Sequence, residues 1–263
     1  TVDITPAHPL ELGGYHSRRN HAKTTRKTDP LSASGLLLQQ GDLQTIIISY
    51  DLIWLSYEFC YHVKQWISSQ YQLPPSRVLL CATHTHSSPQ IMERASYYGQ
   101  PDEQYIAELT EKSKVLINNL IENPEPAEIT FRRTQSSWNG IINRNKVCRN
   151  LFTGRRQCIH SPNPAATHKH HFDMITCRNA SGNIKAMIVK LACHPVFHKR
   201  NRFSADFPGY LRQLIHQNTG QKFPIIFLQG FAGDLRPNYP THTLRERAEQ
   251  FLDTKSLHNG FAK

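Results

Sequence analysis

The chain has 263 residues, and its 31 Lys and Arg outnumber its 20 Asp and Glu, which gives a formal net charge of +11. Hydrophobic residues make up 38% of the sequence and aromatic residues 10%, a composition that excludes disordered, collagen-like and coiled-coil chains. A chain of this length can bury roughly 70% of the surface that it exposes when unfolded. We therefore expect a basic globular protein.

The first half of the sequence predicts strands that alternate with helices. Two β-rich runs at 36–38 and 45–49 flank Gly41-Asp42 and predict a hairpin. Residues 57–71 predict a helix that ends before Pro74-Pro75. The apolar run at 77–82 predicts a buried strand that places the following residues on a loop. The most apolar stretch, 45–63, contains two acidic residues and is too short for a membrane span.

The second half continues this alternation. Apolar residues at helical spacing predict a helix at 102–121. Further strands are predicted at 127–131, 172–176, 184–193 and 224–228, and further helices at 204–217 and from 244 to 252. Because no repeat or linker divides this pattern, we expect one domain of the α/β class, with mixed β-sheets packed with helices as an αββα-like sandwich.

The six cysteines occur singly, without a C-x-x-C pair, which argues against a zinc ribbon or a thioredoxin-type site. Cys81 and Cys193 lie in apolar runs and are expected to be core thiols. Cys148 and Cys158 flank a basic loop and could pair if the protein is exported. The chain starts without a charged and apolar leader, so we expect a signal peptide to be absent or already removed.

Polar clusters follow four of the predicted strands. They are Asp51, the loop 83–89 with His84 and His86, the segment 193–195 with His194, and the glycine-containing loop 229–237. Because α/β proteins bind ligands beyond the carboxyl ends of their strands, these clusters predict a site at one edge of the sheet.

Histidine is the most informative residue type in these clusters. On an extended backbone His84 and His86 would face opposite sides, so one would bind a metal and the other would support it. His194 could supply a second imidazole, and catalytic zinc needs about three protein ligands and an open position. The alternative is that each is an ordinary histidine. The run at 168–171 is interpreted as a solvated loop, and Pro195 argues against a zincin helix built on His194 and His198.

Several function classes lose support from missing motifs. The sequence has no G-x-S-x-G elbow, no Walker loop and no G-x-G-x-x-G fingerprint. Arginine pairs at 18–19, 132–133 and 155–156 could neutralise phosphates, but they are dispersed and lack interleaved aromatic residues. Nucleic-acid binding is therefore disfavoured against a general attraction to anionic surfaces such as a membrane.

A series of short motifs spans nearly the whole chain. It starts with Val2-Asp3-Ile4-Thr5-Pro6, Gly13-Gly14-Tyr15 and Asp29-Pro30-Leu31, and continues with 82–89, Asn143-Arg144, 192–195, 204–209 and 229–234. In this order the motifs resemble the neutral/alkaline non-lysosomal ceramidase family. The resemblance implies that 1–263 is the N-terminal catalytic domain, and that the C-terminal part of the family is missing. It also suggests a secreted or periplasmic location.

The resemblance also implies a set of site residues. His84 and His194 would bind Zn²⁺, His86 would contact the substrate or transition state, and Arg144 would be a cationic clamp near the reacting carbonyl. The family's further zinc ligands, a glutamate and a tyrosine, come from the C-terminal half. The spacing of Tyr239, Glu246 and Glu249 does not identify them as substitutes.

Four more residues are expected to support this centre. Asp51 and Asp206 would orient imidazoles, or would instead be strand-end and helix-cap carboxylates. Gly233 and Asp234 would shape a close backbone approach beside the metal. Arg236 occupies the position at which true ceramidases have a serine.

The leading hypothesis is a zinc-dependent hydrolase of a linear amide, with N-acylsphingosine or another N-acyl lipid as substrate. A metal-activated water would attack the carbonyl, Arg144 or His86 would hold the oxyanion, and a proton would pass to the leaving amine. One alternative is a catalytically impaired remnant that binds anionic lipid or a protein partner, and another is a nucleic-acid-binding domain. The sequence does not indicate an oligomeric state.

Overall fold

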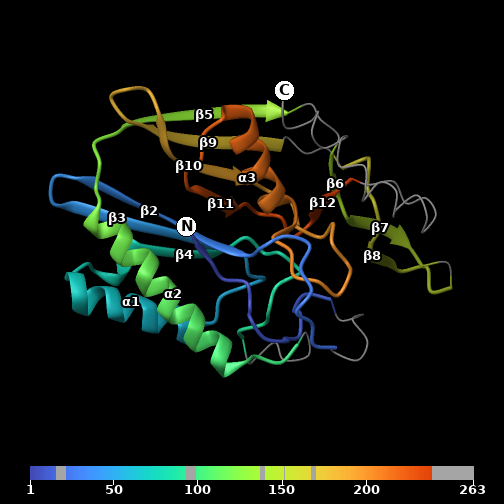
Figure 1. The fold of residues 1–263 in the computed structure, drawn as a ribbon. Helices are drawn as coiled ribbons and strands as arrows, with labels where there is room; N and C mark the ends of the chain where they lie inside the picture. The colour runs from blue at the N-terminus through green and yellow to red at the C-terminus, as the bar shows by residue number, and fades with distance from the viewer. Residues whose placement is uncertain (16–21, 93–98, 137–139, 151, 167–169, 239–263) are drawn as a thin grey trace.

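The computed structural model describes the chain except residues 16–21, 93–98, 137–139, 151, 167–169 and 239–263 (Figure 1). The first four-stranded sheet has the order β1-β2-β3-β4. Its strands are β1 (Val2–Asp3), β2 (Ser32–Gln40), β3 (Leu43–Tyr50) and β4 (Val78–Ala82). Two helices, α1 (Tyr57–Tyr71) and α2 (Glu103–Glu122), cover this sheet.

The second four-stranded sheet has the order β11-β10-β9-β5. Its strands are β11 (Ile225–Gln229), β10 (Ile184–Leu191), β9 (His170–Arg178) and β5 (Glu128–Ser136). The helix α3 (Asp206–Thr219) packs on it. Two small ribbons pair β12 (Leu235–Pro237) with β6 (Ile141–Asn143), and β7 (Asn145–Arg149) with β8 (Arg156–His160). The described chain is thus one domain of mixed sheets packed with three helices, as predicted.

The helix boundaries follow from capping. The side chain of Ser56 accepts a hydrogen bond from the Phe59 N–H and so starts α1, and Asp102 does the same for α2 through the Tyr105 N–H. Gln72 ends α1 in a left-handed conformation with a φ of 55°. The helix predicted at 57–71 is therefore found at those bounds, and the one predicted at 102–121 is shifted by a single residue.

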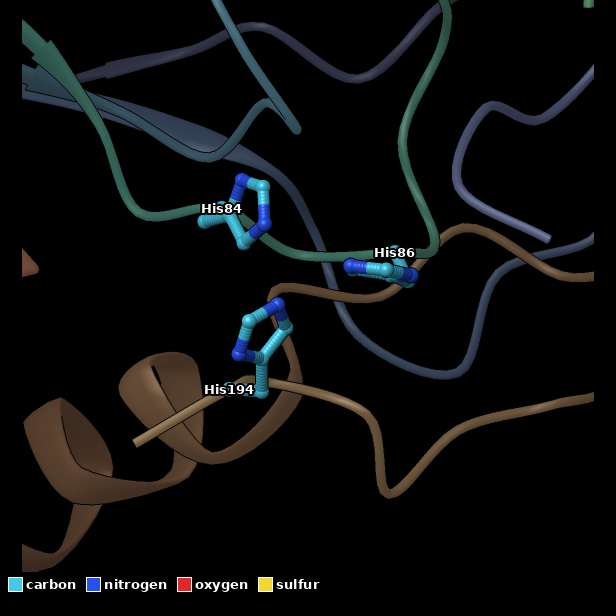
Figure 2. A group of neighbouring side chains, drawn as sticks. All are labelled: His84, His86 and His194. Carbon is cyan, nitrogen blue, oxygen red and sulfur yellow. The ribbon is translucent and has the colours of Figure 1, made fainter. Parts of the chain in front are cut away.

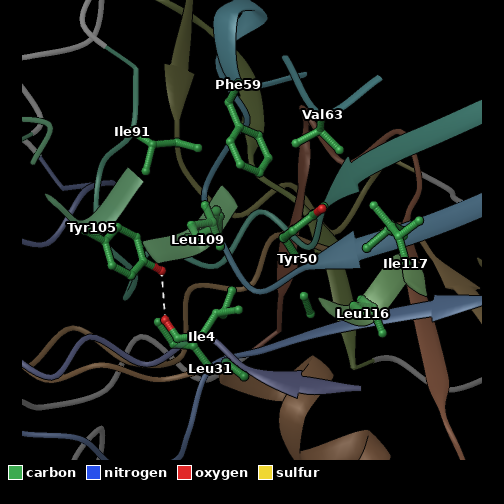
Figure 3. Close-up of a cluster of buried hydrophobic side chains, with 14 of the residues drawn as sticks. Ile4, Leu31, Tyr50, Phe59, Val63, Ile91, Tyr105, Leu109, Leu116 and Ile117 are labelled. Carbon is green, nitrogen blue, oxygen red and sulfur yellow. Dashed lines mark hydrogen bonds between the residues drawn. The ribbon is translucent and has the colours of Figure 1, made fainter. Parts of the chain in front are cut away.

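The core under α1 and α2 is closed by two buried tyrosines (Figure 3). The Tyr105 hydroxyl donates to the Ile4 carbonyl over 2.9 Å, and Tyr50 contacts the Ser113 hydroxyl at 3.1 Å. Since both rings are fully buried, these partners avoid the cost of an unsatisfied hydroxyl. The N-terminal strand and α2 are thereby held against the sheet.

Each four-stranded sheet contains one pair of parallel strands, and these two pairs position the candidate site. β3 and β4 run parallel, with Tyr50 opposite Ala82, and β10 and β11 run parallel, with Leu191 opposite Gln229. β11 lies against the strands of the first sheet, where the Ser49 hydroxyl donates to the Phe227 carbonyl over 2.6 Å. The loops that follow all four strands therefore open at one common edge.

Three details differ from the sequence-based expectations. The segment interpreted as a loop at 168–171 contains the start of β9 at His170, because residues 170 and 171 pair with the end of β5. The ribbon β7–β8 and the strands β1, β6 and β12 were not predicted. The helix predicted from 244 to 252 lies outside the described residues.

The cysteines are free, including Cys148 and Cys158. In the β7–β8 ribbon Cys148 lies opposite Gln157 and Cys158 lies opposite Val147, so the two thiols are on opposite faces of the ribbon. The expected option of a disulfide between them is therefore wrong for this structure. Cys193 is buried as predicted, whereas Cys81 is half-buried. Among the described residues, no helix has both the length and the apolarity to cross a bilayer.

Candidate metal centre

Three histidines meet at the common edge of the two sheets (Figure 2). His84 and His86 come from the loop after β4, and His194 comes from the loop after β10. The ring centroids of His84 and His194 lie 4.8 Å apart, those of His84 and His86 lie 5.1 Å apart, and those of His86 and His194 lie 5.6 Å apart. One candidate ligand atom from each residue lies within 4.8 Å of the others. The three could therefore hold one metal ion.

The backbone of His84 explains why both loop histidines face this space. Its φ of 67° is left-handed, and its N–H donates to the Leu52 carbonyl over 2.9 Å. The His86 N–H donates to the Pro195 carbonyl over 3.3 Å. The expectation that His84 and His86 face opposite sides is wrong, because it assumed an extended backbone. A left-handed non-glycine residue costs of order 1–3 kcal/mol and is typical of functional sites.

Hydrogen bonds to backbone carbonyls set the tautomers of two of the rings. The Nδ1 of His84 lies 2.7 Å from the Ile53 carbonyl oxygen, and the Nδ1 of His194 contacts the carbonyl oxygens of Ala232 and Leu235. Because a carbonyl only accepts, each Nδ1 carries the proton and each Nε2 keeps its lone pair. This is how proteins usually orient a metal-binding histidine.

The charge state of His84 and His194 also suits metal binding. Burial lowers the pKa of His84. Burial, the Arg144 guanidinium and His84 lower the pKa of His194 to about 4. Both imidazoles are consequently neutral at pH 7, as a metal ligand must be.

Arg144 lies beside the cluster, directly after β6. Its Nε and Nη2 donate to the Gly233 carbonyl over 3.1 and 2.9 Å, and Nη2 lies 3.4 Å from the Nε2 of His194. Its own N–H donates to the Asp234 carbonyl over 2.7 Å. Burial and the nearby Arg236 lower the pKa of Arg144. The guanidinium is thus anchored on one side, with the remaining donors close to the imidazoles.

Asp51 and Asp206 lie near this edge but serve other groups. Asp51 is fully buried, where it accepts hydrogen bonds from the Ser32 N–H and hydroxyl over 2.9 Å and pairs with Arg212 of α3. Asp206 begins α3 with a φ of 57° and accepts from the His198 and Phe207 N–H groups over 2.9 and 2.7 Å. Asp51 therefore matches the strand-end interpretation. The helix-cap interpretation of Asp206 is wrong, because Asp206 is the first residue of α3 and the N-cap is Ala205, without a side-chain cap hydrogen bond.

The close backbone approach expected at Gly233 occurs elsewhere in its loop. A Cβ at Gly233 would meet nothing within 4 Å, whereas a Cβ at Gly230 would lie 2.9 Å from the Cβ of Ala192. Asp234 accepts a hydrogen bond from the Asn143 amide over 2.6 Å and so helps to hold the residue that precedes Arg144.

Two residues that the sequence analysis did not assign to the site support His86. Gly14 has a φ of 103°, and a Cβ on it would lie 2.8 Å from the Cα of His86. The Tyr15 ring lies 5.0 Å from the His86 ring, and its hydroxyl donates to the Val196 carbonyl over 3.2 Å. The Gly-Gly-Tyr motif marked these positions, but only the structure brings them to residues more than seventy positions away.

His198 does not belong to the histidine cluster. Among the residues that the structure describes, His84, His86 and His194 form the one group of three or more His, Cys, Asp or Glu side chains that could hold a metal ion. Tyr239, Glu246 and Glu249 lie outside the described residues.

Solved structures of ceramidases have a fold similar to that of this chain. No family model matches the chain, and no curated protein sequence does. The neutral ceramidase of Pseudomonas aeruginosa superposes with a TM-score of 0.78 and 18% identity over 99% of this chain and 42% of that one. A structure described as ceramidase complexed with C2 gives 0.75 and 18% over the same shares. The chain therefore has a ceramidase-like fold and spans less than half the length of these proteins.

Proposed function

We propose that the chain is a zinc-dependent hydrolase of a linear amide, with N-acylsphingosine or another N-acyl lipid amide as substrate. The observation that carries the proposal is the convergence of His84, His86 and His194, with ligand atoms within 4.8 Å of one another. The ceramidase-like fold supports the same reaction class. Neutral imidazole is a good ligand for Zn²⁺, and a catalytic zinc site leaves one position open for reactants.

His84 and His194 are the proposed zinc ligands. The Nδ1 atoms of both donate to backbone carbonyls, which leaves Nε2 as the acceptor atom of each ring, and zinc at His194 would displace the Arg144 Nη2 that lies 3.4 Å from its Nε2. Zinc bound there would supply Lewis-acid polarisation of the amide carbonyl and a water of lowered pKa. His86, which lies against Gly14 and the Tyr15 ring, is the proposed contact to the substrate.

Arg144 is the proposed stabiliser of the oxyanion. A guanidinium has five N–H donors; Nε and Nη2 donate to the Gly233 carbonyl, and Nη2 also lies 3.4 Å from the His194 Nε2. The rest can bind a carbonyl oxygen that becomes negatively charged as the amide is attacked. Because Gly233 and the backbone of Asp234 already hold Arg144, little reorganisation is needed during the reaction.

The test is metal analysis of the purified protein together with hydrolysis of N-acylsphingosine. We expect equimolar zinc in the unmodified chain, and loss of both zinc and activity in His84→Ala and His194→Ala. His62→Ala, an exposed histidine on α1, is the matched control and should keep both. Zinc content that stays unchanged in both site variants would disprove the ligand assignment.

The proposed roles of Arg144 and His86 can be tested separately from metal binding. Arg144→Gln and His86→Asn should keep bound zinc and lower kcat by about 10²–10³-fold, the usual cost of removing an oxyanion donor. A variant that keeps zinc and full kcat would contradict the role given to that residue.

A further inference from the structure

The ribbon β7–β8 projects from the body of the molecule beside β6 and β12 (Figure 1). Its strands pair with each other and with neither four-stranded sheet. Residues 145–160 contain no acidic residue but have four exposed cations, Lys146, Arg149, Arg155 and Arg156. The ribbon is exposed, so burial in a core does not explain its composition. An isolated two-stranded ribbon is also only marginally stable by itself.

Apolar side chains are also exposed on this ribbon. Phe152 at its tip is 98% exposed, Val147 is 55% exposed and Ile159 is 38% exposed. The tip is ordered by Asn150, whose side-chain oxygen accepts from the N–H groups of Phe152 and Thr153 over 2.9 Å each. These two bonds order the turn from which the exposed Phe152 side chain extends.

Two of the cations face each other directly. Arg149 lies opposite Arg156 in the ribbon register, on the same face. Like charges in such a pair destabilise a ribbon, and within the part of the chain that the structure describes no ion pair offsets either of them. An anionic group bound between the two guanidiniums would remove this repulsion and accept charge-assisted hydrogen bonds.

We propose that the β7–β8 ribbon docks the protein on an anionic lipid bilayer, with Phe152 entering the headgroup boundary and the four cations binding lipid phosphates. Exposed aromatic residues combined with Lys and Arg are typical of surfaces that lie in the membrane interface. The aliphatic side chains of Val147 and Ile159 favour lipid over single-stranded nucleic acid, because they offer bases no stacking surface.

The ribbon is rooted at the candidate metal centre. Asn145 follows Arg144 directly, and the Ser161 N–H donates back to the Arg144 carbonyl over 2.8 Å. Phe231, 98% exposed, lies in the same loop as the Gly233 carbonyl that holds Arg144. Docking through the ribbon would bring this edge of the domain to the bilayer surface. The docking proposal is independent of zinc binding.

The test measures sedimentation of the full chain with phosphatidylcholine vesicles that contain or lack phosphatidylserine. We expect salt-sensitive binding to the anionic vesicles only. Phe152→Ala should weaken binding about tenfold. Replacing the four cations by Gln should weaken it by at least a hundredfold, since each cation near such a surface contributes about a fivefold factor.

Matched controls separate the ribbon from net charge and from general apolarity. Phe131→Ala removes an exposed phenylalanine of β5 and should bind like the unmodified chain. A second control removes four exposed cations elsewhere, by Gln substitution of Arg77, Arg132, Arg178 and Lys222. It should keep most of the binding.

Three results would overturn the proposal. They are an equal loss of binding in both four-charge variants, full binding by the ribbon variant, and no binding of the unmodified chain to anionic vesicles, whether or not a single-stranded oligonucleotide binds through the same residues. Circular dichroism and thermal unfolding would confirm that each variant is folded. Zinc content that is unchanged in the ribbon variants would distinguish failure of docking from failure of the proposed hydrolase site.

Discussion

Substitution of Gly14 by alanine tests how tightly the loop at the N-terminus holds His86. The new Cβ would lie 2.8 Å from the Cα, Cβ and Cγ of His86, where ordinary contact begins at 3.4 Å. One of the two segments must therefore move by at least 3.4 − 2.8 = 0.6 Å. Because the nearest atoms are backbone and ring root, a change of rotamer alone cannot relieve the clash.

Two costs add in this variant. The φ of 103° is unfavourable for alanine, by about 1–3 kcal/mol. Overpacking against His86 costs about another 1–3 kcal/mol. We expect a loss of about 2–6 kcal/mol in the free energy of unfolding. With His86 in its proposed role, a displacement of about 1 Å can lower the rate up to 10²-fold, so the proposed activity on N-acylsphingosine should fall further than the stability loss explains.

Urea denaturation and steady-state kinetics of Gly14→Ala would check this expectation. Gly41→Ala is the matched control, since Gly41 also has a positive φ, 57°, but a Cβ there meets nothing within 4 Å. Gly41→Ala should lower the free energy of unfolding only by the cost of alanine at a positive φ, and it should keep full activity. If the two variants were equally stable and equally active, the contact between Gly14 and His86 would not constrain the site.

Two carboxylates test the electrostatics. Asp51→Asn leaves the Arg212 guanidinium without its buried counter-charge and should cost about 3–5 kcal/mol in urea denaturation; a loss below 1 kcal/mol would contradict this. Hydrogen bonds from Arg133 and Lys190 lower the pKa of Asp173 to about 2, from 3.8. A lowered carboxyl pKa stabilises the fold above pH 3.8 and loses this contribution as the pH falls through about 2. Asp173→Asn should therefore cost about 1 kcal/mol at neutral pH, since the Arg133 partner is exposed, and progressively less as the pH falls through about 2; a loss that does not depend on pH would refute the assignment.

The sequence by itself determined the three helices of the described chain, the strands of the two four-stranded sheets except β1, and the edge at which the candidate site lies. The helix at 57–71 follows from the Ser56 cap and the apolar stripe of Phe59, Val63 and Ile67, all local signals. The polar clusters after β3, β4, β10 and β11 also predicted a common edge, because parallel strands end together. The β7–β8 ribbon was missed because its exposed strands lack an apolar alternation.

Only the tertiary structure decided how the histidines converge. The left-handed φ of His84 reverses the side that an extended chain would give it, and this φ is held by the Leu52 and Ile53 carbonyls of another loop. The pairing of Asp51 with Arg212 likewise depends on α3 packing beside β3. Both outcomes depend on contacts between segments that are far apart in the chain. Local sequence patterns do not predict such contacts, because the partners come together only when the chain folds.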